Sequence, residues 1–304
     1  MKQAVIVILL CVACALHIFP QTASTVITSA GYLYTAPAIV APGQVITLFV
    51  INPGPAQMSV TLQQGQAYLV PVLSVGPIFN CPSNPVGCPP FLNVTVQIPY
   101  EMQTPCAGMV CNNLAVATSV AITQNGAVTA SFPLTPLPDH IHILTTCDTV
   151  VSGSGNAPTN GLPCAPLVTH ADGSMVSAQS PAQGNEELVA YAVGLGATNP
   201  AATTGQTVTL PAPAQETFLL GFDFLPNALP AKPVYPLNNV LTIYSTPQFA
   251  GLAPGYVGLY QINFLVPPPG EISPCGGMVQ SNLTVNIAGD FSFDGAGICV
   301  APGQ

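Results

Sequence analysis

Short runs of alternating apolar and polar residues dominate this chain, and turn-forming residues separate them. Its 34 prolines and 27 glycines leave no long window with apolar residues at helical spacing. Alternation with a period of two is typical of strands that bury one face. The strands predicted on this basis are Val45 to Val50, Met58 to Leu62, Leu92 to Ile98, Leu114 to Ile122, Leu188 to Val193, Val240 to Tyr244, Tyr260 to Val266 and Leu283 to Ile287. Asn125 and Gly126 stand between two apolar runs and predict a tight hairpin.

One segment of the chain occurs twice. It is PCAGMVCNNLAV from Pro105 to Val116 and PCGGMVQSNLTV from Pro274 to Val285, with eight of twelve positions identical at a constant offset of 169 residues. Each copy follows an alternating run that ends in proline. The repeat predicts an internal duplication of a β-rich unit, and therefore an all-β chain of two tandem sandwich domains. The duplicated positions expected to be structural are Gly108, Met109, Gly277 and Met278.

The domain boundary is expected in the segment CDTVVSGSGNAPTNGLPC, residues 147–164. Its Gly, Ser, Asn and Pro content is typical of a linker, whereas the cysteines at its two ends predict a loop closed by a disulfide. The expected division is a signal peptide over 1–24, a first domain over 25–146 and a second over 165–304. Both domains are long enough to bury a core.

The N-terminus has the pattern of a secretory signal peptide. Lys2 precedes an apolar block at 4–16, and small residues such as Ala23 follow it. A membrane span would need about 20 apolar residues, so export and cleavage near Ala23 are expected. A lipoprotein anchored at Cys14 is the alternative. Cys11 stands where a leucine-like residue is usual in lipoproteins, so simple export is preferred.

The charge balance excludes several classes of partner. The chain has eleven acidic residues and two basic ones, Lys2 and Lys232, and charged residues make up 4% of it. Nucleic acids and anionic membrane surfaces are bound through clusters of Lys and Arg, which this sequence lacks. We expect a secreted or cell-surface protein, extracellular or periplasmic, whose partner is a protein or a polysaccharide.

Ten cysteines fit this location. Eight follow the signal peptide, namely Cys81, Cys88, Cys106, Cys111, Cys147, Cys164, Cys275 and Cys299. An even number in an exported chain predicts disulfides in preference to metal ligands. Spacing favours Cys81 with Cys88 and Cys147 with Cys164, but many pairings stay open. Because Gln280 replaces the counterpart of Cys111, Cys275 is expected to pair with Cys299 and Cys106 with Cys111. No CxxC pair occurs that would indicate a zinc ribbon or a redox site.

The second half contains HADGSMVSAQSPAQGNEELVAYAVGLGATNP from His170 to Pro200 and GLAPGYVGLYQINFLVPPPG from Gly251 to Gly270. Over 165–290 it resembles a family of uncharacterised C-terminal domains in exported proteins of Solibacter-type Acidobacteria, which share ATGLGPV-like and YAGLAPGFVGLYQVN-like strands. The first half matches more loosely, through APGQVITLFVINPGP at 41–55 and LNVTVQIPYE. The resemblance implies a pair of immunoglobulin-like or IPT/TIG-like sandwiches. It implies no enzymatic activity and no catalytic residues.

Few residues suggest chemistry. His140 and His142 would share a face of a strand and are weak candidates for a zinc or copper site, because a third ligand is missing. His170 and Asp172 lie in a predicted Asp-Gly turn, and the adjacent Glu186 and Glu187 are expected to face opposite ways. Asp290 and Asp294 lack the dense spacing of a calcium loop. No cofactor is expected, and no GxSxG, HExxH, P-loop or EF-hand motif occurs.

Glycan binding and hydrolysis are the two alternatives to a structural role. Sandwich domains often bind sugars through exposed aromatic residues, and the chain has no tryptophan. The tyrosines that could serve instead are Tyr235, Tyr244, Tyr256 and Tyr260, although Tyr244 and Tyr260 fall in predicted strands. The leading hypothesis is an exported, non-enzymatic, adhesion-like module that displays loops on disulfide-linked sandwiches. A glycan-binding module comes second, and a secreted hydrolase with an unidentified site comes third.

Overall fold

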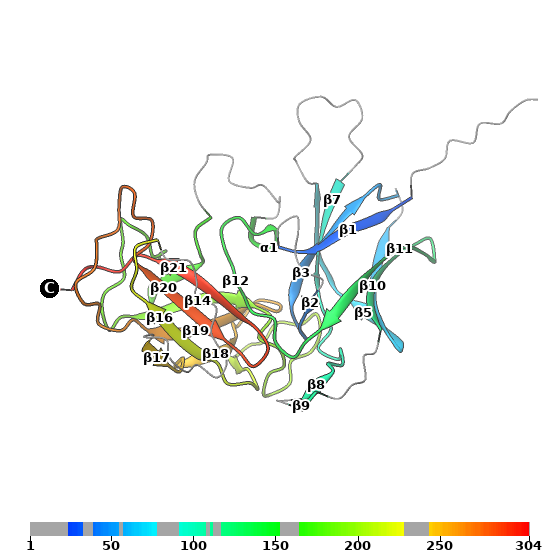
Figure 1. Ribbon diagram of the computed structural model, residues 1–304. Helices are drawn as coiled ribbons and strands as arrows, with labels where there is room; N and C mark the ends of the chain where they lie inside the picture. Colours follow the sequence, from blue (N-terminus) through cyan, green and yellow to red (C-terminus); the bar gives the residue numbers. More distant parts are fainter. Residues whose placement is uncertain are drawn as a thin grey trace, which may run out of the picture.

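The computed structural model describes residues 24–32, 39–54, 57–77, 91–107, 110–111, 117–152, 164–227 and 243–303 (Figure 1). Several expectations lie outside these residues. They are the signal peptide over 1–23 with Cys14, the Cys81–Cys88 pair, Gly108, Met109 and Tyr235. The side chains of Cys106, Cys111 and Tyr244 also lie outside the described part.

The first half of the chain forms two sheets that face each other. One has the order β1 (Val26–Gly31), β3 (Val45–Ile51), β7 (Phe91–Gln97) and β6 (Val72–Pro77). The other has the order β2 (Ile39–Val40), β11 (Ala127–Pro136), β10 (Thr118–Gln124), β4 (Met58–Gln64) and β5 (Gln66–Val70). Neighbouring strands are antiparallel, except that β2 and β11 are parallel. A separate pair, β8 (Cys106–Ala107) and β9 (Val110–Cys111), places Cys106 opposite Cys111 in its register.

The second half also has two sheets. One contains β12 (His142–Ile143), β14 (Glu187–Val193), β19 (Tyr260–Leu265), β18 (Phe249–Leu252) and β15 (Ala212–Pro213), and β13 (Val168–His170) pairs with β14 as well. The other has the order β17 (Ile243–Ser245), β16 (Leu219–Asp223), β20 (Leu283–Ala288) and β21 (Phe293–Ile298). The one helix among the described residues is the four-residue α1 (Thr149–Ser152).

Each half has its own hydrophobic core between its two sheets. In the first half, Leu48 and Val94 from one sheet pack with Leu62 and Val120 from the other. In the second half, apolar residues of β14 and β19 meet those of β16 and β20 in the same way. Because alternate strand residues point to one face, the period-two pattern of the sequence places these side chains inside. The prediction of an all-β chain is therefore confirmed.

The predicted strands that fall within the described residues are present. β3, β4, β7, β14, β19 and β20 occupy the predicted positions within a residue or two at each end. The hairpin at Asn125 and Gly126 is confirmed too, since Gln124 pairs with Ala127. Both turn residues have positive φ, 51° and 77°, as a two-residue hairpin turn requires.

The chain crosses between the two halves earlier than residue 147. β12 falls within the range expected for the first domain, yet it pairs with β14 of the second half. Ile141 and Ile143 accordingly belong to the second core. In Figure 1, β12 and α1 lie between the two halves of the molecule.

Two of the expected disulfides are present. Cys147 is bonded to Cys164, which follows it by 17 residues, and Cys275 is bonded to Cys299 near the C-terminus. Within the described part of the chain, no helix is long and apolar enough to cross a membrane.

Candidate functional site

The two halves enclose an apolar cleft where they meet. Its volume is about 550 Å³, which is within the range of small-molecule sites. One wall comes from the β1-β3-β7-β6 sheet, through Val45, Leu73 and Thr95. The opposite wall comes from β14 and the 253–259 connection, through Tyr191 and Tyr256. The cleft therefore depends on how the two halves are joined.

The cleft has a buried floor and an exposed apolar rim. Nine of its thirteen described lining residues are Val or Leu, and none of the thirteen is charged. Val45 belongs to the buried floor. At the rim, Leu73 is 40% exposed, Val151 of α1 is 42% exposed and Tyr256 is 62% exposed. Exposed apolar residues around a concave surface are typical of a binding site.

Direct contacts fix one wall of the cleft against the other. Gly205 N donates to Gln97 Oε1 at 2.6 Å, and Tyr100 N donates to Thr204 Oγ1 at 2.9 Å. Gly258 packs so tightly on the first half that a Cβ there would lie 2.6 Å from a methyl carbon of Val45. These contacts hold the cleft in shape before any ligand binds, which lowers the entropic cost of binding.

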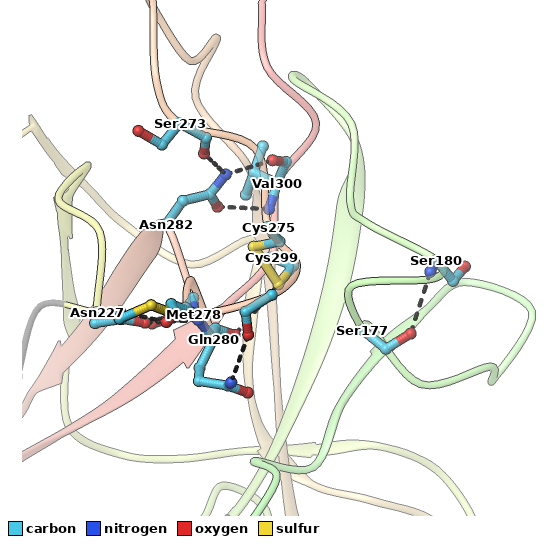
Figure 2. Close-up of a disulfide and its surroundings, with 12 residues drawn as sticks. Ser177, Ser180, Asn227, Ser273, Cys275, Met278, Gln280, Asn282, Cys299 and Val300 are labelled. Carbon is cyan, nitrogen blue, oxygen red and sulfur yellow. Dashed lines mark hydrogen bonds between the residues drawn. A yellow bond between two sulfur atoms is a disulfide. The ribbon is translucent and has the colours of Figure 1, made fainter.

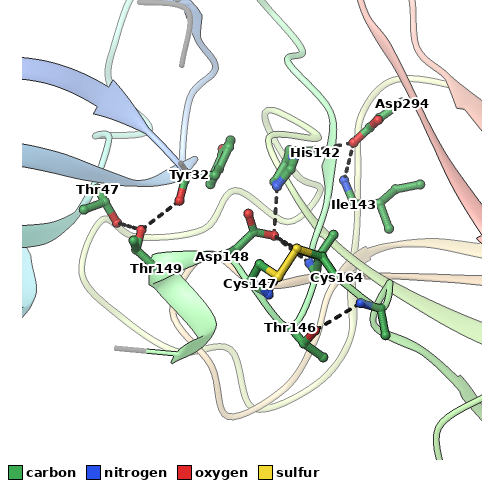
Figure 3. Close-up of polar contacts among 12 residues, drawn as sticks. Tyr32, Thr47, His142, Ile143, Thr146, Cys147, Asp148, Thr149, Cys164 and Asp294 are labelled. Carbon is green, nitrogen blue, oxygen red and sulfur yellow. Dashed lines mark hydrogen bonds and ion pairs between the residues drawn. A yellow bond between two sulfur atoms is a disulfide. The ribbon is translucent and has the colours of Figure 1, made fainter. Parts of the chain in front are cut away.

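A polar cluster joins the halves beside the cleft, and we call Tyr32, His142, Asp148 and Asp294 the His142 clasp. Tyr32 follows β1 of the first half, and its ring stacks on the His142 imidazole with centroids 3.9 Å apart. His142 Nε2 lies 3.0 Å from Asp148 Oδ2, and His142 Nδ1 lies 3.3 Å from Asp294 Oδ2. Figure 3 shows the imidazole with a carboxylate at each ring nitrogen.

The surroundings of His142 favour its charged form. Burial alone would lower the pKa of His142, but the hydrogen bonds and negative charges of Asp148 and Asp294 outweigh burial and raise it to about 9. The imidazole is therefore protonated at neutral pH and makes an ion pair with a carboxylate on each side. Asp148 is fixed in turn, because Thr145 N donates to its Oδ2 at 2.6 Å.

The clasp continues into the wall of the cleft. Cys147, which is bonded to Cys164, immediately precedes Asp148, and Thr149 follows it. Thr149 Oγ1 lies 2.5 Å from Thr47 Oγ1 of β3 and donates to Tyr32 O at 3.1 Å (Figure 3). The next residues, Val150 and Val151, line the cleft. One short segment thus links the disulfide, the clasp and the apolar surface.

No family model matches this sequence, and no curated protein matches it. The resemblance to exported C-terminal domains consequently remains an expectation. Function has to be inferred from the cleft and the side chains around it.

His140 and His142 do not converge on a common point. His140 Nδ1 lies 3.1 Å from Gln44 Nε2 of the first half, whereas both ring nitrogens of His142 face carboxylates. Burial and the nearby charge of His142 lower the pKa of His140. Among the described residues, no group of three His, Cys, Asp or Glu side chains is arranged to hold a metal ion. The two histidines join the halves of the molecule instead.

A second group of acidic residues, Asp139, Glu216 and Asp290, lies before β12 and close to the turn that follows β20. Asp139 is fully buried, and its carboxylate accepts hydrogen bonds from Phe291 N at 2.9 Å and from Ser292 Oγ. Burial, a hydrogen bond to Asp139 and the charges of Asp139 and Asp290 raise the pKa of Glu216 to about 8. A cavity of about 390 Å³ lies nearby, but neither Asp139 nor Glu216 is among its described lining residues. The pair is therefore not presented across a cleft as glycosidase acids are.

The remaining acidic residues considered in the sequence, and His170, make hydrogen bonds within their own surroundings. Asp172 Oδ1 accepts from Ser174 N at 2.9 Å, which closes the predicted turn. His170 Nδ1 lies 2.5 Å from Glu186 Oε1, whereas Glu187 Oε1 accepts from Asn263 Nδ2 at 3.1 Å. Glu186 and Glu187 thus face different neighbours. Asp290 and Asp294, considered together for calcium, belong to two separate clusters.

The tyrosines considered for glycan binding have different surroundings. Tyr260 is fully buried, and its hydroxyl donates to Gly196 O. Tyr256 stands exposed at the rim of the cleft, and Tyr191, which the sequence did not single out, lines the same cleft. One of the four tyrosines considered is therefore available to a ligand within the described part of the chain.

The second copy of the repeated motif has a structural role (Figure 2). Asn282 is fully buried, and its Nδ2 donates to Ser273 O at 2.9 Å and to Val300 O at 2.7 Å. Its Oδ1 accepts from Val300 N at 2.8 Å. Gly277 has a φ of 60° in the turn beside Met278, which is exposed. The disulfide of Cys275 and Cys299 closes the same region.

Sequence reasoning missed Tyr32, Asp148 and Glu216, and it considered Asp294 only as a calcium ligand. They come from segments far apart in the chain, and no local spacing connects them. Asp148 alone had a local signal, because it follows a cysteine of the predicted disulfide and precedes a threonine and two valines.

Proposed function

We propose that this protein is an exported, non-enzymatic interaction module made of two immunoglobulin-like sandwiches, and that its partner binds in the cleft between them. The observation that carries the proposal is the cleft itself. It is preformed, uncharged in its described lining and exposed at its rim. A rigid concave surface of this kind recognises a partner by shape and apolar contact and needs no catalytic group.

The arrangement of strands supports a duplicated pair of sandwiches. β7 begins at Phe91 and β19 begins at Tyr260, so their first residues are separated by the 169-residue offset of the repeated motif. Each of these strands lies between two antiparallel neighbours in its sheet, β3 and β6 for β7 and β14 and β18 for β19. Equivalent strands at equivalent positions are what a duplication would produce.

The disulfides support an extracellular or periplasmic location. Cys147–Cys164 and Cys275–Cys299 are typical of proteins that fold in an oxidising compartment. The signal-like N-terminus and the scarcity of charged residues favour the same location. The partner expected there is a protein or polysaccharide of the cell surface.

Thermal unfolding of the mature, oxidised protein against a panel of ligands tests the proposal. The panel contains polysaccharides, cell-wall fragments, surface protein extracts, apolar small molecules and divalent metals. A ligand that binds only the folded state raises the temperature of the unfolding midpoint. At a free ligand concentration of a hundred times its Kd, it adds about 2.7 kcal/mol to the free energy of unfolding. We expect at least one ligand to raise the midpoint, and we expect a substitution in the cleft to abolish that rise. A shift that every cleft variant retains would place the binding site elsewhere and contradict the proposal.

Glycan binding is the second candidate, and the exposed ring of Tyr256 favours it. Aromatic rings at a rim can stack on a sugar while their hydroxyls form hydrogen bonds. A glycan in the cleft should depend on Tyr256, so Tyr256→Ala should remove a polysaccharide-induced shift and Tyr256→Phe should retain most of it. Equal shifts in both variants would rule out stacking on this ring.

A further inference from the structure

The chemistry of the cleft favours a ligand class other than the protein or polysaccharide expected from the sequence, on the assumption that the cleft is the binding site proposed above. Leu73, Val151 and Tyr256 expose apolar surface around a floor of buried Val and Leu. Removing apolar surface of both partners from water favours binding in proportion to the area buried. A hydrated sugar chain would offer few apolar atoms to most of this surface, whereas a hydrocarbon chain or ring would cover it.

The charge around the cleft excludes charged ligands. Its thirteen described lining residues include no Asp, Glu, Lys, Arg or His, so neither a cation nor an anion meets an opposite charge there. The charged groups nearest to the lining along the chain, His142 and Asp148, are paired with each other. The described residues also contain no Lys or Arg, and the whole chain carries a formal charge of −9. An anionic head such as a fatty-acid carboxylate would be repelled and left without a partner.

The rim offers groups for a small neutral head. Ser74 of β6 and Tyr256 of the opposite wall are lining residues that carry hydroxyl groups. A few polar groups beside a mostly apolar surface are typical of sites that orient a ligand by one end.

We propose that the cleft binds an uncharged, predominantly apolar small molecule, a lipid-like chain or ring that carries a neutral hydroxyl-type head. The apolar part lies along the valines and leucines of β3, β6 and α1, and the head lies at the rim near Ser74 and Tyr256. Because both walls contribute, the ligand contacts both halves of the protein and stabilises their arrangement.

A matched pair of ligands tests the charge requirement. The neutral fluorescent probe N-phenyl-1-naphthylamine is titrated into the mature, oxidised protein, and decanol or decanoate is then added as competitor at pH 7. The two competitors share a chain length and differ in the charge of the head. Saturable fluorescence enhancement is expected, with decanol displacing the probe at a concentration about tenfold or more below that of decanoate. Equal competition, or no saturable binding of the probe, would overturn the proposal.

Substitutions locate the site. The double variant Leu73→Gln with Val151→Gln puts two amides at the rim, and we expect it to weaken probe binding about tenfold. Val128→Gln is the matched control, because Val128 is 63% exposed on β11 and does not line the cleft. Should the double variant unfold, Tyr256→Ala replaces it, because this side chain is largely exposed. Equal affinities in cleft variant and control would overturn the location.

The outcomes separate this inference from the proposed function. A polysaccharide or a surface protein that raises the unfolding midpoint through the cleft, with no probe binding, would overturn the apolar class and leave the interaction module standing. Probe binding that is weakened by Val128→Gln and unchanged in the Leu73→Gln, Val151→Gln double variant would overturn this inference and leave the interaction module standing. Probe binding lost in the cleft variant alone supports both.

Discussion

The two halves of the protein meet through two unlike surfaces, the His142 clasp and the apolar cleft. In the clasp, one imidazolium lies between two carboxylates, and Asp148 also accepts a hydrogen bond from a backbone amide. In the cleft, whose lining includes a residue two positions after Asp148, the side chains of Leu73, Val151 and Tyr256 remain exposed. The side chains of the clasp are paired with one another, whereas the described lining of the cleft exposes apolar surface that a ligand or a partner would cover.

The difference indicates a division of labour within one interface. Directional ion pairs and close backbone packing set the angle between the halves, because such contacts tolerate little displacement. Apolar contact is non-directional and tolerates several ligand shapes. Fixing the halves with polar groups lets the cleft stay open. Damage to the clasp should therefore change stability strongly, and changes to the cleft should change binding alone.

The largest loss of stability is expected from Gly194→Ala. The new side chain would force the backbone at 194 away from the segment that contains His140 and His142. A Cβ at Gly194, where φ is 83°, would lie 2.0 Å from His140 O. The chain from 138 to 143 would have to move, and we expect a loss of about 3–4 kcal/mol in the free energy of unfolding, measured in urea.

Gly126→Ala is the matched control for Gly194→Ala. Gly126 also has a positive φ, 77°, but its Cβ would meet no atom within 4 Å. Backbone strain alone should cost about 1–2 kcal/mol there. Similar losses in the two variants would show that the contact with His140 is not what makes Gly194 necessary.

The next largest effect is expected from His142→Gln. The pKa of His142 is about 9 in the folded protein against its ordinary value of 6.5, so the clasp contributes fully below pH 6.5 and is lost as pH rises through 9. The variant should lose about 2–3 kcal/mol at pH 6 and little at pH 10. Urea unfolding at several pH values measures this. A loss that is equal at both pH values would mean that packing on Tyr32, and not charge, holds the clasp.

The sequence predicted the strands but not the contacts of the clasp, and both results have the same physical cause. Strands such as β3 and β19 are encoded by local alternation, and Asn125-Gly126 encodes its turn by its own backbone preference. The clasp is encoded by the packing of one half on the other, which brings Tyr32 and Asp294 to the same imidazole across the whole chain. Local spacing in His140-Ile-His142 suggested one shared site, but tertiary packing gives the two histidines different neighbours and opposite pKa shifts.

A smaller effect of opposite sign is expected from Glu216→Gln. The pKa of Glu216 is raised from 4.5 to about 8, so the folded state favours its protonated form, and stability falls as pH rises from about 4.5 to 8. An amide mimics the protonated acid. Because Glu216 is only half-buried, solvent screening should limit the gain to about 1–2 kcal/mol at pH 8, with little change at pH 4. Glu187→Gln, which removes an exposed carboxylate elsewhere, is the matched control for the loss of one negative charge. If the stability of Glu216→Gln fell with pH as steeply as that of the wild type, Glu216 would not cause the fall, and His142 would remain as its cause.

The smallest effect on stability is expected in the cleft itself, and it is the one that tests the division of labour. Leu73 and Val151 are 40% and 42% exposed, so replacing either with Gln removes few buried contacts. Such surface substitutions usually change stability by about 0.5 kcal/mol or less. Calorimetry of both variants should give midpoints close to wild type while probe binding weakens. If Val151→Gln instead destabilised the protein as much as His142→Gln, the valines of α1 would be part of what joins the halves. The cleft would then be a consequence of packing and not a surface kept for a ligand.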